Sequence, residues 1–269
     1  EAALAALRAP GTVRRLAFEP AGCRTVQLAL DVAERGAAAE LAAGLRGSVA
    51  EAIRSPHANY VLQKIIKVLT PSETPFIVQE IAQEHMDFAR HEYGCRIYCR
   101  LLEHAVEDES TSKLLDSVLV ESDDLIRHTF GHHVVECALE HGLAHQRHHI
   151  MQVLRRSLMA NASNRNAAYV MEKAVLYGLP EDQEALASEF LARTPGEVAA
   201  LARTQCGSMV LRALLRVPGH VAQRLQDHLR VGAPQVQLKA SKHGRRLLDS
   251  HCLGPAHGGA GGAAAAATA

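Results

Sequence analysis

The chain has 269 residues, of which 48% are hydrophobic and 22% are charged, a composition that excludes a disordered or collagen-like protein. No run approaches the ~18 apolar residues of a membrane span, no leader sequence opens the chain, and six scattered cysteines do not make a disulfide scaffold. We therefore expect a protein of a reducing compartment, cytoplasmic with a nuclear or nucleolar alternative. The start at Glu1 rather than Met predicts a fragment or processed product.

The formal net charge is zero, but the charges are unevenly distributed. Residues 1–70 carry nine basic and six acidic residues, residues 71–200 carry 11 and 21, and residues 201–269 carry nine and two. Basic ends around an acidic middle allow a polyanion to lie on part of the surface, and a solvated acidic face is the simpler reading.

A short pattern recurs along the chain: a small residue, two polar or planar residues, two large apolar residues and a polar residue. The small residues that open the copies are Gly22, Ala58, Gly94, Gly131, Ala167, Gly207 and Gly244. Counted from the residue after each, the steps are 36, 36, 37, 36, 40 and 37 residues, so the chain contains a structural repeat. We number the positions of each copy from the residue after the small one.

Each period contains two helical patterns. The copy continues as a helix, as in residues 60–69 and 97–102, and the stretches 76–81, 114–119 and 150–154 have apolar residues three and four apart. Three prolines stand near expected helix starts: Pro71, Pro180 and Pro195.

The absence of tryptophan and of strand-like alternation agrees with an all-α fold. We predict a right-handed α-solenoid of about seven two-helix repeats with a period of about 36 residues, curved so that one face is concave. This domain is expected over residues 1–253, and the Gly/Ala-rich residues 254–269 are expected to be a flexible tail.

Position two of the copies carries flat side chains. Read down the chain it holds Arg24, Tyr60, Arg96, His133, Tyr169, Met209 and Arg246, of which all but Met209 are planar. Nucleic-acid bases stack on such groups with about 1–3 kcal/mol per base. The seven position-two residues together therefore predict stacking platforms spaced by one repeat. Any one of them alone is equally compatible with an ordinary surface residue.

Positions one and five are one helical turn apart and share a face. The pairs are Cys23/Gln27, Asn59/Gln63, Cys95/Cys99, His132/Glu136, Ala168/Glu172, Ser208/Arg212 and Arg245/Asp249. Side chains such as Asn59 and Gln63 suit the edge of an unpaired base. We predict base-edge contacts from all of these residues except Ala168 and Asp249.

Three copies carry a family resemblance. Gly22–Leu28, Ala58–Lys64 and Tyr93–Ile97 resemble the first three repeats of a Pumilio-homology (PUF) RNA-binding domain, and the likeness covers roughly residues 10–253. The resemblance implies single-stranded RNA read at one base per repeat, with the N-terminal repeat at the 3′ base. Family members usually have eight repeats, whereas seven copies are found here.

Carried over by resemblance, Cys23 and Gln27 imply adenine, and Asn59 and Gln63 imply uracil. Cys95 again implies adenine, although Cys99 replaces the family's usual Gln.

Glu136 and Glu172 resemble the Glu used on guanine, but His132 and Ala168 replace the usual Ser. The last two copies fit no common base code, and the basic C-terminal third is expected to hold phosphates through charge.

Other chemistry is weakly represented. His128/His132, His145/His149 and Cys95/Cys99 have metal-ligand spacing, yet no CxxC or HExxH motif accompanies them, so neither a metal nor another cofactor is predicted. The chain has no GxSxG, P-loop or Rossmann glycine motif, and no enzyme activity is expected.

The leading hypothesis is a monomer that binds single-stranded RNA, in particular mRNA 3′ untranslated regions, and regulates translation or mRNA stability. Protein partners are expected on the convex face. The alternatives are an armadillo- or HEAT-like protein scaffold and a nucleolar PUF relative that binds RNA without base specificity.

Overall fold

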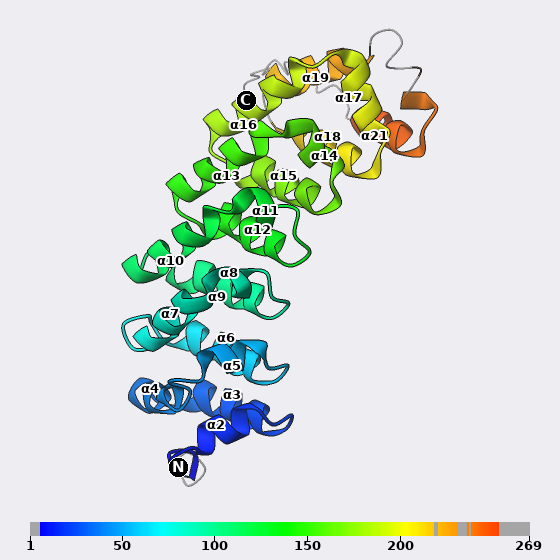
Figure 1. The fold of residues 1–269 in the computed structure, drawn as a ribbon. Helices are drawn as coiled ribbons and strands as arrows, with labels where there is room; N and C mark the ends of the chain where they lie inside the picture. Colours follow the sequence, from blue (N-terminus) through cyan, green and yellow to red (C-terminus); the bar gives the residue numbers. More distant parts are fainter. Residues whose placement is uncertain (1–5, 218–219, 231–235, 237, 253–269) are drawn as a thin grey trace, which may run out of the picture.

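The computed structural model describes residues 6–217, 220–230, 236 and 238–252, and these residues form helices and connecting turns with no strand among them. The helices follow one another as a curved stack from the N-terminus to the C-terminal repeats (Figure 1). The predicted all-α solenoid is therefore confirmed. The predicted tail, residues 254–269, lies outside the described residues.

Each of the first six repeats contains three kinds of helix, and for the seventh the structure describes the column helix. The column helices carry the sequence pattern and are α3 (Gly22–Val32), α6 (Ala58–Val68), α9 (Gly94–Ala105), α12 (Gly131–His141), α15 (Arg165–Tyr177), α18 (Gln205–Leu214) and α21 (Lys242–Cys252). The outer helices are α4 (Arg35–Ala43), α7 (Pro75–Ile81), α10 (Glu109–Leu119), α13 (Ala144–Arg156), α16 (Pro180–Leu191) and α19 (His220–Arg230). A 3₁₀ turn, η1 (Ala82–Glu84), follows α7.

The sequence analysis missed the third kind, a short helix before each of the first six column helices. These are α2 (Thr12–Ala17), α5 (Val49–Arg54), α8 (His85–Ala89), α11 (Ser122–Leu125), α14 (Leu158–Ser163) and α17 (Pro195–Ala202). Most have four to six residues, which is too short for a 3.6-residue apolar period to stand out in a sequence.

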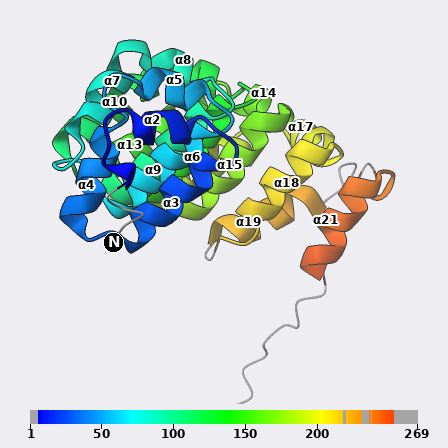
Figure 2. The same cartoon turned by 90° about the horizontal axis from the view of Figure 1, so that it is seen from below.

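The column helices lie on the inner side of the curve. Successive column helices pack on one another along the whole stack, and more extensively than successive outer helices do. Helices on the inside of an arc lie closer together than those on the outside, so the closer packing of the column helices identifies them as the inner row. Seen along the stack, α4, α7, α10 and α13 lie on one side and α3, α6, α9 and α15 on another (Figure 2).

The large apolar residues at positions three and four form the core, as predicted. Val61 and Leu62 on α6 and Ile97 and Tyr98 on α9 are fully buried, and Tyr98 Oη donates to the carbonyl oxygen of His85 at 2.8 Å. There are two exceptions: the position-three side chain of Thr25 is exposed, and the position-four side chain of Leu248 is half-buried. Helices α16 and α17 begin at Pro180 and Pro195, whereas Pro75 rather than Pro71 begins α7.

Packing explains the glycine that opens five of the seven copies. A Cβ added to Gly94 would lie 2.2 Å from the carbonyl oxygen of Phe88 at the end of α8, and one added to Gly207 would lie 2.3 Å from that of Leu201 in α17. Real Cβ atoms do not approach so closely, so glycine allows the short helix to cross the start of the column helix.

Six column helices also share a capping contact. A side chain three residues before the small residue accepts a hydrogen bond from the backbone N–H of that residue. The caps are Ser55, His91, His128, Asn164, Thr204 and Ser241, with N···acceptor distances between 2.9 and 3.3 Å. Such contacts satisfy backbone donors that the first helical turn leaves unpaired.

Candidate nucleic-acid interface

The position-two side chains lie at the surface of the column helices. Arg24, Tyr60, Arg96, His133, Tyr169 and Arg246 are exposed, and Met209 is half-buried. Tyr60 and Tyr169 keep 44% and 39% of their surface accessible. Because successive column helices pack side by side, the exposed groups form one row along the inner face of the stack, which we call the column face.

The position-one side chains lie deeper than the sequence analysis anticipated. Cys23, Asn59, Cys95, His132, Ala168 and Ser208 are buried, and only Arg245 is exposed.

The polar members of this buried set hydrogen-bond to the backbone at the start of their own helix. Asn59 Nδ2 donates to the carbonyl oxygen of Ser55 at 2.7 Å, Ser208 Oγ donates to that of Gln205 at 2.9 Å, and His132 Nδ1 lies 2.8 Å from that of His128. Position one therefore forms the floor of the column face.

The position-five side chains stand above this floor. Gln27, Gln63, Cys99, Glu136, Glu172 and Arg212 are half-buried, and Asp249 is exposed. Gln63 Nε2 donates to Asn59 Oδ1 at 2.9 Å, and Gln27 Nε2 donates to the carbonyl oxygen of Cys23 at 3.1 Å. The predicted pairing of positions one and five is thus a direct contact in the second repeat.

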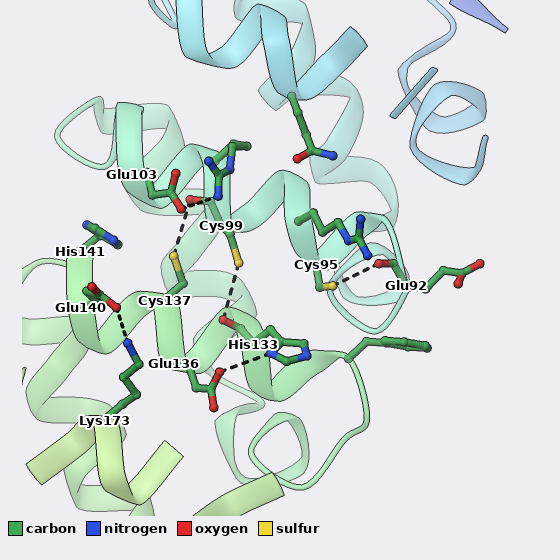
Figure 3. Close-up of a pocket in the computed structure, with 14 residues that line it drawn as sticks. Glu92, Cys95, Cys99, Glu103, His133, Glu136, Cys137, Glu140, His141 and Lys173 are labelled. Carbon is green, nitrogen blue, oxygen red and sulfur yellow. Dashed lines mark hydrogen bonds and ion pairs between the residues drawn. The ribbon is translucent and has the colours of Figure 1, made fainter. Parts of the chain in front are cut away.

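A groove of about 480 Å³ runs across the middle of the column face (Figure 3). It brings together predicted residues from three repeats: Gln63, Cys95, Arg96, Cys99, His133 and Glu136. The rings of His132 and His133 lie 3.9 Å apart between centroids, and His133 Nδ1 is 3.3 Å from a Glu136 carboxylate oxygen. Burial lowers the pKa of His132, so its neutral form is favoured.

Other groove residues were missed by the sequence analysis. They occupy positions six, nine and ten, which lie one helical turn beyond positions two, five and six. They include Arg100, Glu103, Cys137, Glu140, His141 and Lys173. Arg100 Nη2 pairs with Glu103 Oε1, and Lys173 Nζ pairs with Glu140 Oε2, both at 2.6 Å. The i,i+4 extension of the face was the signal that would have found them.

Two half-buried aromatic residues were also missed. Tyr93 and Phe130 directly precede the small residues of the third and fourth copies. Phe130 lines the groove beside Arg96 and His133, and Tyr93 makes an edge contact with His91 at 5.6 Å between centroids. These rings add flat surface to the central repeats, and their fixed place before the small residue would have identified them.

A second hollow, of about 300 Å³, joins position two of the fifth and sixth repeats. Tyr169 and Met209 line it together with Arg165, Gln205 and Cys206. Position-two residues of neighbouring repeats therefore share one surface depression, as required if a flat ligand is to lie between them.

In the described part of the chain, none of the helices has the length and apolar character needed to cross a bilayer.

Comparison with known proteins identifies a known repeat in the central part of the chain. The model of the Pumilio-family RNA binding repeat matches residues 54–82, 86–119 and 123–155. Each matched segment contains the column helix of one repeat, and together the three segments run from the last residue of α5 to the last turn of α13.

Proteins similar to this chain in sequence carry the Pumilio name. A Pumilio domain-containing protein of Schizosaccharomyces pombe is 23% identical over 234 residues, 87% of this chain and 34% of the relative. Putative pumilio homolog 7, chloroplastic, of Arabidopsis thaliana is 24% identical over 248 residues, 90% of this chain and 37% of the relative. The chain thus spans about a third of the length of these relatives.

Solved structures share the fold. PUF-8 in complex with PBE-RNA aligns with a TM-score of 0.81 at 22% identity, covering 88% of this chain and 70% of that one. The Puf3 RNA binding domain bound to a Cox17 RNA 3′ UTR recognition sequence aligns with a TM-score of 0.80 at 21% identity, covering 89% and 73%. The matches to the family's repeat within residues 54–155, together with the Pumilio-named relatives, identify these repeats as Pumilio-homology (PUF) repeats.

Proposed function

We propose that the column face binds single-stranded RNA at one base per repeat. The observation that carries the proposal is the exposure of Tyr60, Arg96, His133 and Tyr169 on consecutive, mutually packed column helices. Flat groups at this spacing offer each base a face to stack on. The similar folds whose descriptions name bound RNA support the same assignment.

Base selection would come mainly from position five. Its side chains are half-buried above the position-one floor, so a base stacked on position two meets Gln63 or Glu136 first. In the second repeat, the Asn59–Gln63 contact holds the glutamine amide in place, which favours one base edge over others. By family resemblance this base is uracil.

The cellular role extends this proposal. Binding within mRNA 3′ untranslated regions and regulation of translation or mRNA stability in the cytoplasm are supported by the Puf3 neighbour, whose bound RNA is a 3′ UTR recognition sequence. The protein would act as a monomer, by binding rather than catalysis, and would recruit protein partners through the outer helices.

Selection from a randomised RNA pool tests base reading. We expect an enriched motif in which uracil stands next to a 3′-terminal adenine. The double variant Asn59→Ser with Gln63→Glu is expected to change uracil to guanine at that position alone. The control is Gln79→Glu on the outer helix α7, where the glutamine side chain is exposed. It makes the same charge change away from the column face and is expected to leave the motif unchanged.

Two other outcomes would overturn base reading. RNA binding without any enriched motif would support a relative that binds through charge, which the arginines at positions one, two and five of the last two repeats favour: Arg212, Arg245 and Arg246. No RNA binding at all would support a protein-interaction scaffold.

A further inference from the structure

Two pairs of metal-ligating side chains face each other across the groove. Cys99 and Glu103 are four residues apart on α9, and Cys137 and His141 are four residues apart on α12. Residues four apart lie on the same face of a helix. The offset between the pairs is 38 residues in both cases, so packing of α9 against α12 brings them into register.

The side chains converge in the structure. A carboxylate oxygen of Glu103, the Sγ of Cys137 and a ring nitrogen of His141 all lie within 4.8 Å of one another (Figure 3). Each thiol hydrogen-bonds to the backbone of the other helix. Cys99 Sγ donates to the carbonyl oxygen of His133, and Cys137 Sγ donates to that of Cys99, both at 3.6 Å. Cys99 lines the same groove one helical turn before Glu103, and its thiol neighbours that of Cys137.

We propose that this cluster is a zinc site that joins the third and fourth repeats, with Glu103, Cys137 and His141 as ligands and Cys99 as the fourth. Sulfur, imidazole nitrogen and carboxylate oxygen are the donors that Zn²⁺ takes in tetrahedral sites. Paired ligands from two neighbouring helices supply this set. The site lies on the proposed RNA-binding face and shares Cys99 with it, but metal binding is measured without RNA, so failure of one proposal is distinguishable from failure of the other.

The charges of the loaded site balance. Binding replaces the two thiol protons, which pass to solvent, so two thiolates and one carboxylate surround the dication and leave one negative charge. The Arg100 guanidinium, 2.6 Å from Glu103 Oε1, offsets that charge and fixes the carboxylate in the groove. The other carboxylate oxygen, Oε2, has His104 Nε2 at 3.7 Å.

Metal titration of the chelator-treated full chain in a phosphine reductant tests the site. With CoCl₂ as the probe, we expect one ion per chain and the near-ultraviolet absorption of a cysteinate–Co²⁺ bond, removed by one equivalent of ZnCl₂. His141 is exposed, so His141→Ala keeps the fold and is expected to weaken Co²⁺ binding about tenfold or more. Glu103→Gln is expected to act in the same direction.

Matched controls separate this site from general thiol or imidazole binding. Cys206→Ser removes a half-buried cysteine on α18, and His145→Ala removes an exposed imidazole on the outer helix α13. Both variants are expected to keep full stoichiometry and affinity. The proposal is overturned by absence of cysteinate absorption, by binding of less than one ion per chain, or by His141→Ala binding as tightly as the unmodified chain.

Discussion

In repeats two to four, the exposed position-two side chains are Tyr60, Arg96 and His133, whereas repeats six and seven have Met209 and Arg246 there. The packing beneath them is alike in the two regions. Gly94 and Gly207 make equally close approaches to the preceding short helix, and a polar side chain caps the column helix in both. The architecture of the repeat is thus maintained independently of the chemistry on its surface.

The largest effect is expected from the packing glycines. Gly94→Ala and Gly207→Ala place a Cβ 2.2 and 2.3 Å from a carbonyl oxygen, so each should lower the free energy of unfolding by about 1–3 kcal/mol. Chemical denaturation followed by circular dichroism measures this. Gly36→Ala, in open space on α4, should be neutral or stabilising. An effect at Gly94 without one at Gly207 would show that the two regions are not built alike.

Substitutions at position two should weaken RNA binding more in repeats two to four than in repeats six and seven. Tyr60→Ala removes a stacking platform and is expected to weaken binding to the selected RNA by roughly 5- to 150-fold, the equivalent of about 1–3 kcal/mol. Met209→Ala removes no planar group and should change the Kd less than Tyr60→Ala does. Fluorescence anisotropy gives both values. Equal losses for the two variants would remove the distinction between a reading and a non-reading region.

The salt dependence of binding should show the reverse pattern. Arg246→Gln deletes an exposed charge from the last column helix and is expected to reduce the slope of log K against log salt by about 0.7. Tyr60→Ala should leave that slope unchanged. Arg193→Gln, exposed after the outer helix α16, is the matched charge control. An unchanged slope for Arg246→Gln would refute phosphate binding by the C-terminal repeats.

The smallest effect is a local dependence on pH. Burial, with a contribution from Arg90, lowers the pKa of His128 below its usual 6.5, and its Nδ1 caps α12 by accepting from Gly131 N–H at 3.1 Å. The stabilisation is fully present above pH 6.5 and decreases as the pH falls below that value, because protonation removes the acceptor.

Hydrogen exchange locates this effect. At acidic pH we expect the amide protection at the start of α12 to fall. Protection at the starts of α15 and α18 should not change, because their caps Asn164 and Thr204 do not titrate. His128→Asn, which retains an acceptor without titrating near neutral pH, should abolish the pH response. A response that persists in this variant would assign it to other histidines.

Much of this arrangement could be predicted from the sequence. The period, the all-α solenoid and the apolar positions three and four follow from residue spacing, since helices stacked in repeats bury the same positions each time. The exposure of Tyr60 and Tyr169 followed from the same register.

Three features could not be predicted. The short helices have too few residues to show a period. The burial of Asn59 and Ser208 depends on how the first turn of each column helix packs, which the sequence pattern does not encode. The convergence of Glu103, Cys137 and His141 depends on the offset between two neighbouring helices.

Side-chain footprinting with hydroxyl radicals tests the location of the RNA most directly. Tyr60 is 44% exposed on the column face, and Val120 is 76% exposed at the end of the outer helix α10. The account predicts that saturating RNA slows labelling of Tyr60 and Tyr169 and leaves Val120 unchanged. Protection of Val120 with unchanged labelling of the two tyrosines would place the RNA on the outer helices and contradict the account.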